Sequence, residues 1–185
     1  MPNPTQPFGW QFIDHHTFSS DAAALALPTG YTRYKLELTE IVMVTDSEVP
    51  FLRFAAGSGD ITDFENDTSD YEFEVNALQA AGTNLDDETS QTTAIHLIPA
   101  AFNLGNVTDE FFMCTVWIDG ARNTALKTLI SWLGTYIAPG GELTVIRGGG
   151  KYTTAETNEA VQIVGESAAI ATGGCTLFGL NVPSS

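Results

Sequence analysis

The chain has 185 residues, of which 43% are hydrophobic, and these values are typical of one globular domain rather than a disordered segment. Its 7 Lys and Arg stand against 23 Asp and Glu, so the formal net charge is −16. Such a chain repels phosphate backbones and anionic lipids, which excludes nucleic acids and membranes from the expected partners. The charge favours a partner with a basic face, or simply reflects a source whose proteins are all acidic.

The first nine residues contain three prolines, Pro2, Pro4 and Pro7, which disfavour both helix and sheet. We expect residues 1–9 to form an extended arm that lies along a neighbouring subunit. Residues 10–185 are expected to form one domain. The N-terminus lacks the basic and apolar regions of a signal peptide, and no apolar run approaches the roughly 20 residues that span a bilayer.

Strand patterns begin at Trp10 and continue through the first half of the chain. The clearest covers residues 31–44, where apolar residues alternate with charged or polar ones, so the period of two predicts a strand with one wet face. Shorter strands are expected over 51–55, 71–75 and 94–98. Two polar, acidic segments lie between these strands and are expected to be long surface loops: 60–70 and 81–92.

The second half contains the most apolar strand pattern, residues 110–118, whose continuous apolarity predicts burial on both faces. Residues 127–137 are rich in β-branched and aromatic residues, which favours a strand, although the leucine spacing also permits a helix. Further strands are expected over 142–147, 160–164 and 172–179. Many short strands between Gly- and Asp-rich turns, without a convincing amphipathic helix, predict an all-β protein, an antiparallel β-sandwich.

No motif fits a catalytic constellation, so no catalytic residue is expected. Gly148–Lys151 lacks the earlier glycine of a phosphate-binding loop, and Tyr152 stands where Ser or Thr holds magnesium, so a turn between strands is expected there. Gly165-Glu166-Ser167 lacks the last glycine of a nucleophile elbow and is also expected to be a turn. Paired carboxylates for glycoside hydrolysis stay open in a chain with 23 acids.

One candidate metal site lies in the densest acidic cluster. Its oxygen ligands are spaced two to three residues apart, as calcium accepts in a flexible loop: Asp60, Asp63, Glu65, Asp67 and Asp70. Because the EF-hand pattern is not met, a solvated acidic loop is favoured over a calcium site. No other cofactor is expected, because the three histidines lack further ligands at zinc spacing: His15, His16 and His96.

Two cysteines, Cys114 and Cys175, do not make a disulfide framework. Each lies in an apolar strand-like run, and an isolated cysteine in such a run packs as a small hydrophobic residue. We therefore expect both to be buried free thiols.

Three short motifs carry a family resemblance: Trp10-Gln11-Phe12-Ile13, Tyr31-Thr32-Arg33-Tyr34-Lys35-Leu36 and Gly173-Gly174-Cys175-Thr176-Leu177-Phe178-Gly179-Leu180. In order and spacing they resemble a widespread group of bacteriophage virion proteins with a jelly-roll-like sandwich. The resemblance implies a non-enzymatic particle component that forms homo-oligomers, often trimers, on the capsid surface or on tail fibres. Assembly in the bacterial cytoplasm and residence in the virion are implied in the same way.

Within that class the chain favours a capsid decoration (cement) protein that stabilises the shell by docking on the major capsid protein. A tail-fibre or host-attachment domain is the alternative, but the chain has no heptads and no repeats. Exposed aromatic residues would favour attachment; for Trp117, Trp132 and Tyr136, packing in the core is expected instead. A carbohydrate-binding module or glycan-cleaving enzyme on a jelly roll stays open as a different class.

Overall fold

The computed structural model describes residues 9–56, 62–80, 85–102, 104–107 and 109–181, and the side chains of these residues apart from 85–91, 102 and 181. The described chain is all-β, with a single 3-10 turn and no helix that is long and apolar enough to cross a membrane. Its elements are β1 (Gly9–Thr17), β2 (Ala23–Ala26), β3 (Arg33–Met43), β4 (Pro50–Ala56), β5 (Tyr71–Gln79), β6 (Leu85–Thr92), β7 (Ile95–His96), η1 (Ala100–Phe102), β8 (Phe112–Asp119), β9 (Leu129–Ile137), β10 (Leu143–Tyr152), β11 (Asn158–Gly165) and β12 (Ile170–Asn181).

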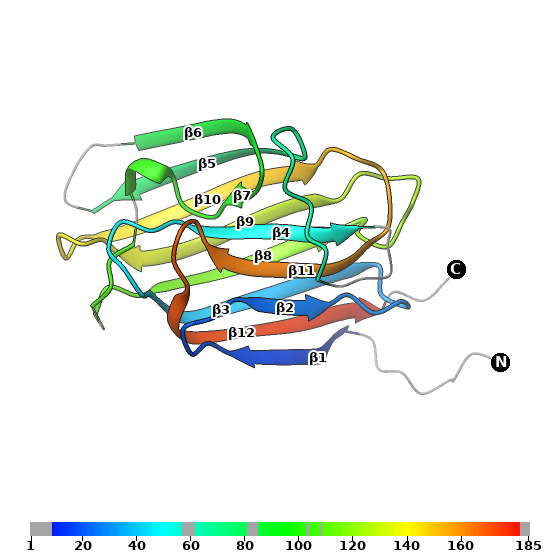
Figure 1. The fold of residues 1–185 in the computed structure, drawn as a ribbon, viewed down its shortest axis with the longest axis horizontal. Helices are drawn as coiled ribbons and strands as arrows, with labels where there is room; N and C mark the ends of the chain where they lie inside the picture. Colours follow the sequence, from blue (N-terminus) through cyan, green and yellow to red (C-terminus); the bar gives the residue numbers. More distant parts are fainter. Residues whose placement is uncertain (1–8, 57–61, 81–84, 103, 108, 182–185) are drawn as a thin grey trace.

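The strands form two sheets that are stacked face to face, which confirms the expected antiparallel β-sandwich (Figure 1). The large sheet has eight strands in the order β1-β12-β3-β8-β9-β10-β5-β6, and the small sheet has four in the order β2-β11-β4-β7. Figure 1 shows the small sheet lying over the middle strands of the large one. One face of the large sheet therefore packs on the small sheet, and no second sheet of the described chain packs on its other face.

The strand order is that of a jelly roll. β1 pairs with β12, β2 with β11, β3 with β8 and β4 with β7, all antiparallel, so these eight strands form one long hairpin. The hairpin is rolled up, since β12 also pairs with β3 and β11 with β4. The remaining strands, β5–β6 and β9–β10, are two antiparallel hairpins that widen the large sheet.

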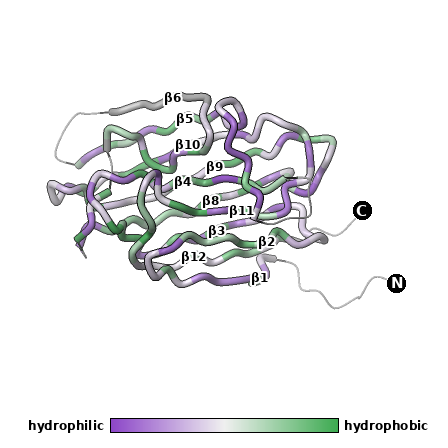
Figure 2. The backbone as a smooth tube through the Cα atoms, in the orientation of Figure 1, coloured by the Kyte–Doolittle hydropathy of each residue, from purple (hydrophilic) through white to green (hydrophobic). Residues whose placement is uncertain are grey.

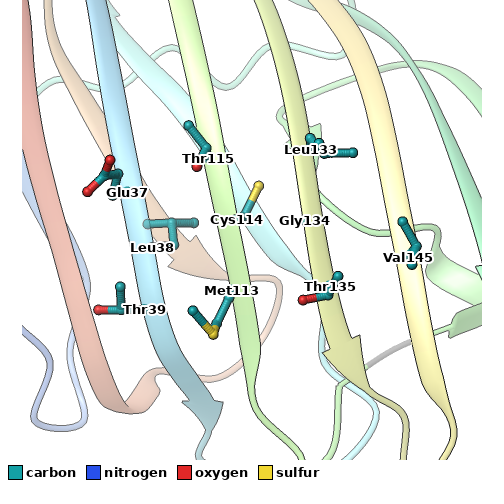
Figure 3. Close-up of a pocket in the computed structure, with 10 residues that line it drawn as sticks. All are labelled: Glu37, Leu38, Thr39, Met113, Cys114, Thr115, Leu133, Gly134, Thr135 and Val145. Atoms are coloured by element: carbon teal, nitrogen blue, oxygen red, sulfur yellow. The ribbon is translucent and has the colours of Figure 1, made fainter.

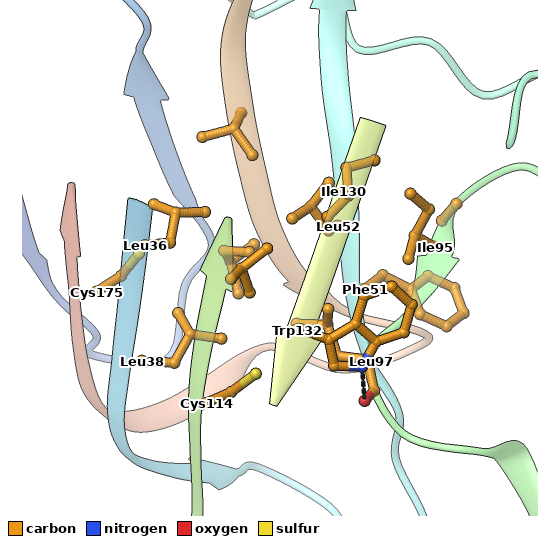
Figure 4. Packing of buried hydrophobic residues seen from close by; sticks show 14 of the residues in the cluster. Leu36, Leu38, Phe51, Leu52, Ile95, Leu97, Cys114, Ile130, Trp132 and Cys175 are labelled. Atoms are coloured by element: carbon orange, nitrogen blue, oxygen red, sulfur yellow. Dashed lines mark hydrogen bonds between the residues drawn. The ribbon is translucent and has the colours of Figure 1, made fainter. Parts of the chain in front are cut away.

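Side-chain alternation builds one hydrophobic core between the sheets. Tyr34, Leu36 and Leu38 of β3 point into it, as the period of two predicted, and the intervening residues point outward. The strands accordingly change between hydrophobic and hydrophilic residues along their length (Figure 2). Trp132 of β9 is 2% exposed, and its indole N–H donates to the Leu97 carbonyl oxygen at 2.9 Å, which satisfies its one polar atom inside the core (Figure 4).

The expectation that residues 110–118 are buried on both faces is wrong. In β8 buried residues alternate with more accessible ones, and Met113 is 42% exposed. The reason is the position of the strand: β8 lies inside the large sheet, and the small sheet covers only one side of it. The apolar side chains on the second face therefore point into solvent.

The expected turn at Gly148–Lys151 is also wrong, because these residues continue β10. Gly148, Gly149 and Gly150 pair with β9 on one side and β5 on the other. A Cβ on Gly148 would lie 2.1 Å from the indole ring of Trp132. Glycine in the middle of this strand thus leaves space for a core side chain and does not form a turn.

The segment 81–92, expected to be a loop, contains β6, which pairs with β5 along its length. β6 is the edge strand of the large sheet. Charged residues are common on edge strands because they discourage pairing with another chain. The acidic composition of this segment therefore marks an edge rather than a loop.

Candidate functional site: the outer face of the large sheet

The outer face is defined here as the side of the large sheet that is turned away from the small sheet. In the described part of the chain, eleven large hydrophobic side chains are exposed. Eight of them lie on strands of the large sheet at outward positions: Trp10, Phe12, Leu78, Met113, Leu129, Leu133, Leu143 and Val145. An uncovered face of an antiparallel sheet is usually polar, so this concentration makes the outer face the candidate interaction surface.

An aliphatic groove crosses the middle of the outer face. Its first part is a hollow of about 420 Å³ over β3, β8, β9 and β10, where Glu37, Met113, Leu133 and Val145 contribute side chains (Figure 3). A second hollow of about 270 Å³ is lined by Leu133 and Val145 again, and by Leu78 and Arg147. The shared residues join the two hollows into one groove.

The groove continues into a third, more polar hollow of about 410 Å³ between β10 and β5. Glu74, Asn76, Arg147, Gly148 and Gly149 line it. Gly149 points outward, and a Cβ there would meet only the Ile130 carbonyl oxygen, at 3.8 Å. The missing side chain at this position keeps the hollow open beside the Arg147 guanidinium.

An aromatic cluster lies at the other end of the outer face, over β1, β12 and β3. The Lys35 ammonium lies 4.5 Å from the ring centroid of Phe178 and 5.4 Å from that of Trp10. Phe12 meets Phe178 edge to face, with centroids 6.4 Å apart. Trp117 of β8 pairs directly across from Lys35. Cation–π attraction holds Lys35 over rings that are themselves accessible.

Charges on the outer face are balanced. The regularly paired outward positions of β3, β8, β9, β10 and β5 carry four of the seven cations of the chain and four carboxylates. Three ion pairs join six of them: Arg33 with Asp119, Lys35 with Glu37, and Lys151 with Glu72. Arg147 and Glu74 remain, and neither forms an ion pair with any described residue. The outer face is therefore close to neutral in a molecule of net charge −16.

The acidic cluster lies away from this face, in the segment before β5. Asp60 is outside the described residues; Asp70 accepts a hydrogen bond from the Asp67 backbone N–H at 2.7 Å and so closes a turn. Burial, together with the nearby Asp70, raises the pKa of Glu65. Among the described residues, no three His, Cys, Asp or Glu side chains come together as a metal site. The solvated acidic loop, favoured over a calcium site from the sequence, stays a prediction.

The other expected residues are spread over the fold. His15 contacts Thr176 and Thr17, His16 contacts Asp21, and His96 stacks on Phe51, so the three imidazoles lie in different surroundings. Trp132 and Tyr136 are in the core, as expected, whereas Trp117 is half-buried on the outer face. The arm prolines Pro2, Pro4 and Pro7 lie outside the described residues.

Cys114 and Cys175 are buried free thiols, which confirms the expectation. Burial raises the pKa of both, that of Cys175 to about 12, so neither is a thiolate at neutral pH.

The outer face itself was missed from the sequence, although a signal was present. Residues 111–114 are apolar at successive positions, and 127–137 contain the adjacent apolar pairs Leu129-Ile130, Trp132-Leu133 and Tyr136-Ile137. Both faces of a strand with that pattern need a cover. Within the described chain the small sheet covers only one face of these strands. No family model, curated protein or solved structure matches this sequence.

Proposed function

We propose that the protein is a non-enzymatic structural component of a bacteriophage particle, which acts by binding other protein subunits through its outer face. The observation that carries the proposal is the row of exposed aliphatic side chains on that face, represented by Leu133 at 54% exposure. Leaving such a surface in water is unfavourable, and a subunit that covers it gains free energy from the apolar area removed from water. The resemblance of three motifs to phage virion proteins supports the particle context.

The size of the face supports a protein partner. Eight strands about 4.8 Å apart, with about 3.4 Å per residue, give an outer face of roughly 34 by 30 Å, or ~1,000 Å². A stable protein interface buries about 800 Å² on each partner. The outer face is therefore large enough to make one complete interface.

Capsid decoration is the role we favour within this class. Since the outer face is nearly neutral, almost the whole charge of −16 lies on the rest of the surface. An acidic surface binds readily to a basic patch on a major capsid protein. The protein would then stabilise the shell as a homo-oligomer, with the trimer implied by the resemblance as one arrangement.

Electron microscopy of particles tests the proposal. Antibodies raised against the purified chain should label intact phage particles from a lysate of the source culture, at regular positions on the head. Labelling on tail fibres would keep the particle assignment and replace decoration by attachment. Particles that carry no label, while the protein is present in the same lysate, would contradict the proposal.

Host attachment through a glycan is a second candidate, which the aromatic cluster favours. Trp10, Phe12 and Phe178 expose ring faces or edges next to Lys35, and sugars stack on such surfaces. A glycan array should then show binding that Phe12→Ala removes, and a reducing-sugar assay on the bound glycans separates attachment from cleavage. Absence of binding on the array excludes this candidate for the glycans displayed.

A further inference from the structure

We propose that the first partner of the outer face is a second copy of this chain, with the two outer faces packed together about a two-fold axis. Arg147 of each copy then pairs with Glu74 of the other. The inference deepens the proposed function, on which it rests, by naming the subunit that covers the aliphatic groove.

Electrostatics favours this face over the rest of the surface as the meeting point of two copies. Each copy carries a net charge of −16, so two copies repel each other in most orientations. On β3, β8, β9, β10 and β5 the outer face has equal numbers of cations and carboxylates at its regularly paired positions, and three of each are already joined within the chain. Contact through the outer face brings together two neutral surfaces and holds the acidic surfaces apart.

Shape and apolar character favour the same contact. Two sheets pack face to face about 10 Å apart, with the side chains of one entering the spaces of the other. The hollows of about 420 and 270 Å³ provide such spaces beside Leu133 and Val145, and the side chains that project around them are themselves aliphatic. A second outer face therefore supplies aliphatic side chains that fill these hollows, and it offers the same hollows to the side chains of the first.

The two charges of these strands that have no ion pair among the described residues select the symmetric arrangement. Arg147 and Glu74 both line the third hollow, on neighbouring strands and diagonal to one another. In a two-fold contact every interaction occurs twice, so one unpaired cation and one unpaired carboxylate per copy become two reciprocal ion pairs. An arginine and a carboxylate that lose water need such partners, and the guanidinium fork can bind both carboxylate oxygens.

Charge reversal at these two positions tests the inference. The variants are Arg147→Glu and Glu74→Arg, measured separately and as an equimolar mixture by sedimentation equilibrium. Each single variant places like charges in both reciprocal pairs, and its dissociation constant should rise roughly 100-fold. The mixture should restore association, because the carboxylate introduced by Arg147→Glu meets the guanidinium introduced by Glu74→Arg. The other reciprocal pair in the mixed dimer is the native one, Arg147 with Glu74, and is complementary as well.

Mixing distinguishes a pair between copies from a pair within one chain. A contact confined to one chain is broken in each single variant and cannot be repaired by adding the other. Matched controls are Lys127→Glu and Glu166→Arg, which make the same charge changes at exposed positions outside the outer face. Glu166→Arg should self-associate at least as strongly as the native protein, because it lowers the net negative charge. Lys127→Glu, which raises that charge, should weaken association far less than Arg147→Glu.

A second measurement does not depend on charge. Arg147→Cys and Glu74→Cys should form a mixed disulfide dimer when combined under mild oxidation, while the buried Cys114 and Cys175 stay unreacted. Circular dichroism checks that every variant keeps the β-sheet spectrum; both positions are on the surface, so the fold should persist.

Several outcomes would overturn the inference. The inference is wrong if the native protein stays monomeric at about 100 µM or forms a trimer. It is also wrong if the mixture of the two charge variants remains monomeric. These outcomes leave the proposed function standing if particles are labelled by the antibody. Conversely, restored association with unlabelled particles supports the dimer and contradicts the particle role.

Discussion

Glu48 is a buried carboxylate whose hydrogen bonds outweigh its burial. It is 5% exposed and lies beside the turn after β11. The Ser167 backbone N–H donates to Oε2 at 3.0 Å, and the hydroxyls of Ser167 and Thr45 donate to Oε1. Burial alone raises the pKa of Glu48, but these donors more than offset it and hold the pKa below its ordinary value of 4.5. The charged form therefore stabilises the fold.

The first prediction concerns the pH dependence of this contribution. Because the folded pKa is lowered, the stabilisation is present above the unfolded pKa near 4.5 and is lost as the pH falls through the folded pKa. Glu48→Gln should reduce the free energy of unfolding by about 1.5–3 kcal/mol at pH 7. The difference from the native protein should shrink at pH 3, as measured by urea unfolding at both pH values.

Glu166→Gln is the matched control for this prediction, because Glu166 is next to Ser167 in the turn after β11 but is itself exposed. It should change stability by less than about 0.5 kcal/mol. Equal effects of the two substitutions, or a Glu48→Gln effect that does not depend on pH, would contradict the role assigned to the buried hydrogen bonds.

At the scale of elements, β10 combines two different uses of glycine. Gly148 points inward, where the Trp132 ring occupies the space that a Cβ would need. Gly149 points outward into the third hollow, where a Cβ makes only an ordinary van der Waals contact with the Ile130 carbonyl oxygen. Of these two neighbouring glycines, Gly148 thus leaves space for a side chain in the core, and Gly149 leaves space on the outer face.

The second prediction follows from this contrast. Gly148→Ala should destabilise the protein by about 1–3 kcal/mol, since Trp132 must move and its hydrogen bond to Leu97 is strained. Gly149→Ala should be neutral or slightly stabilising, because alanine restricts the unfolded chain. Thermal unfolding followed by tryptophan fluorescence measures both. A larger loss for Gly149→Ala than for Gly148→Ala would show that the strand faces are assigned wrongly.

Element by element, the alternating patterns predicted most strands well. The strands expected over 31–44, 127–137 and 172–179 appear as β3, β9 and β12. The errors share a cause. Gly148–Gly150 look like a turn and 81–92 look like a loop, but pairing with strands distant in sequence holds both segments extended. The composition of a short segment carries no information about the distant strands with which it pairs.

At the scale of the whole molecule, the two added hairpins matter most. The small sheet packs on the other face of the large sheet, so each strand that widens the large sheet also enlarges its outer face. β5, β9 and β10 supply five of the exposed aliphatic side chains: Leu78, Leu129, Leu133, Leu143 and Val145. The two hairpins thus supply most of the exposed aliphatic side chains of the outer face.

The third prediction concerns salt. Two copies of charge −16 repel each other at long range, and this repulsion is screened as the Debye length falls from about 30 Å at 0.01 M to about 8 Å at 0.15 M salt. Self-association should therefore strengthen when NaCl is raised from ~10 to ~150 mM. Sedimentation equilibrium measures the trend. Steady weakening over this range would show that attraction between charges, rather than apolar contact, dominates the interface.

The sequence alone determined the β class, the strands with clean alternation and the buried thiols, because these depend on local periodicity and on the hydrophobicity of short segments. It also contained the apolar outward residues of β8 and β9, but not their exposure. Which face of each strand is covered, and which charges meet a partner, was decided by the tertiary structure. The physical reason is that burial depends on the order in which distant strands pair. Arg147 and Glu74 are far apart in the sequence, and only strand pairing brings them to the same hollow of the outer face.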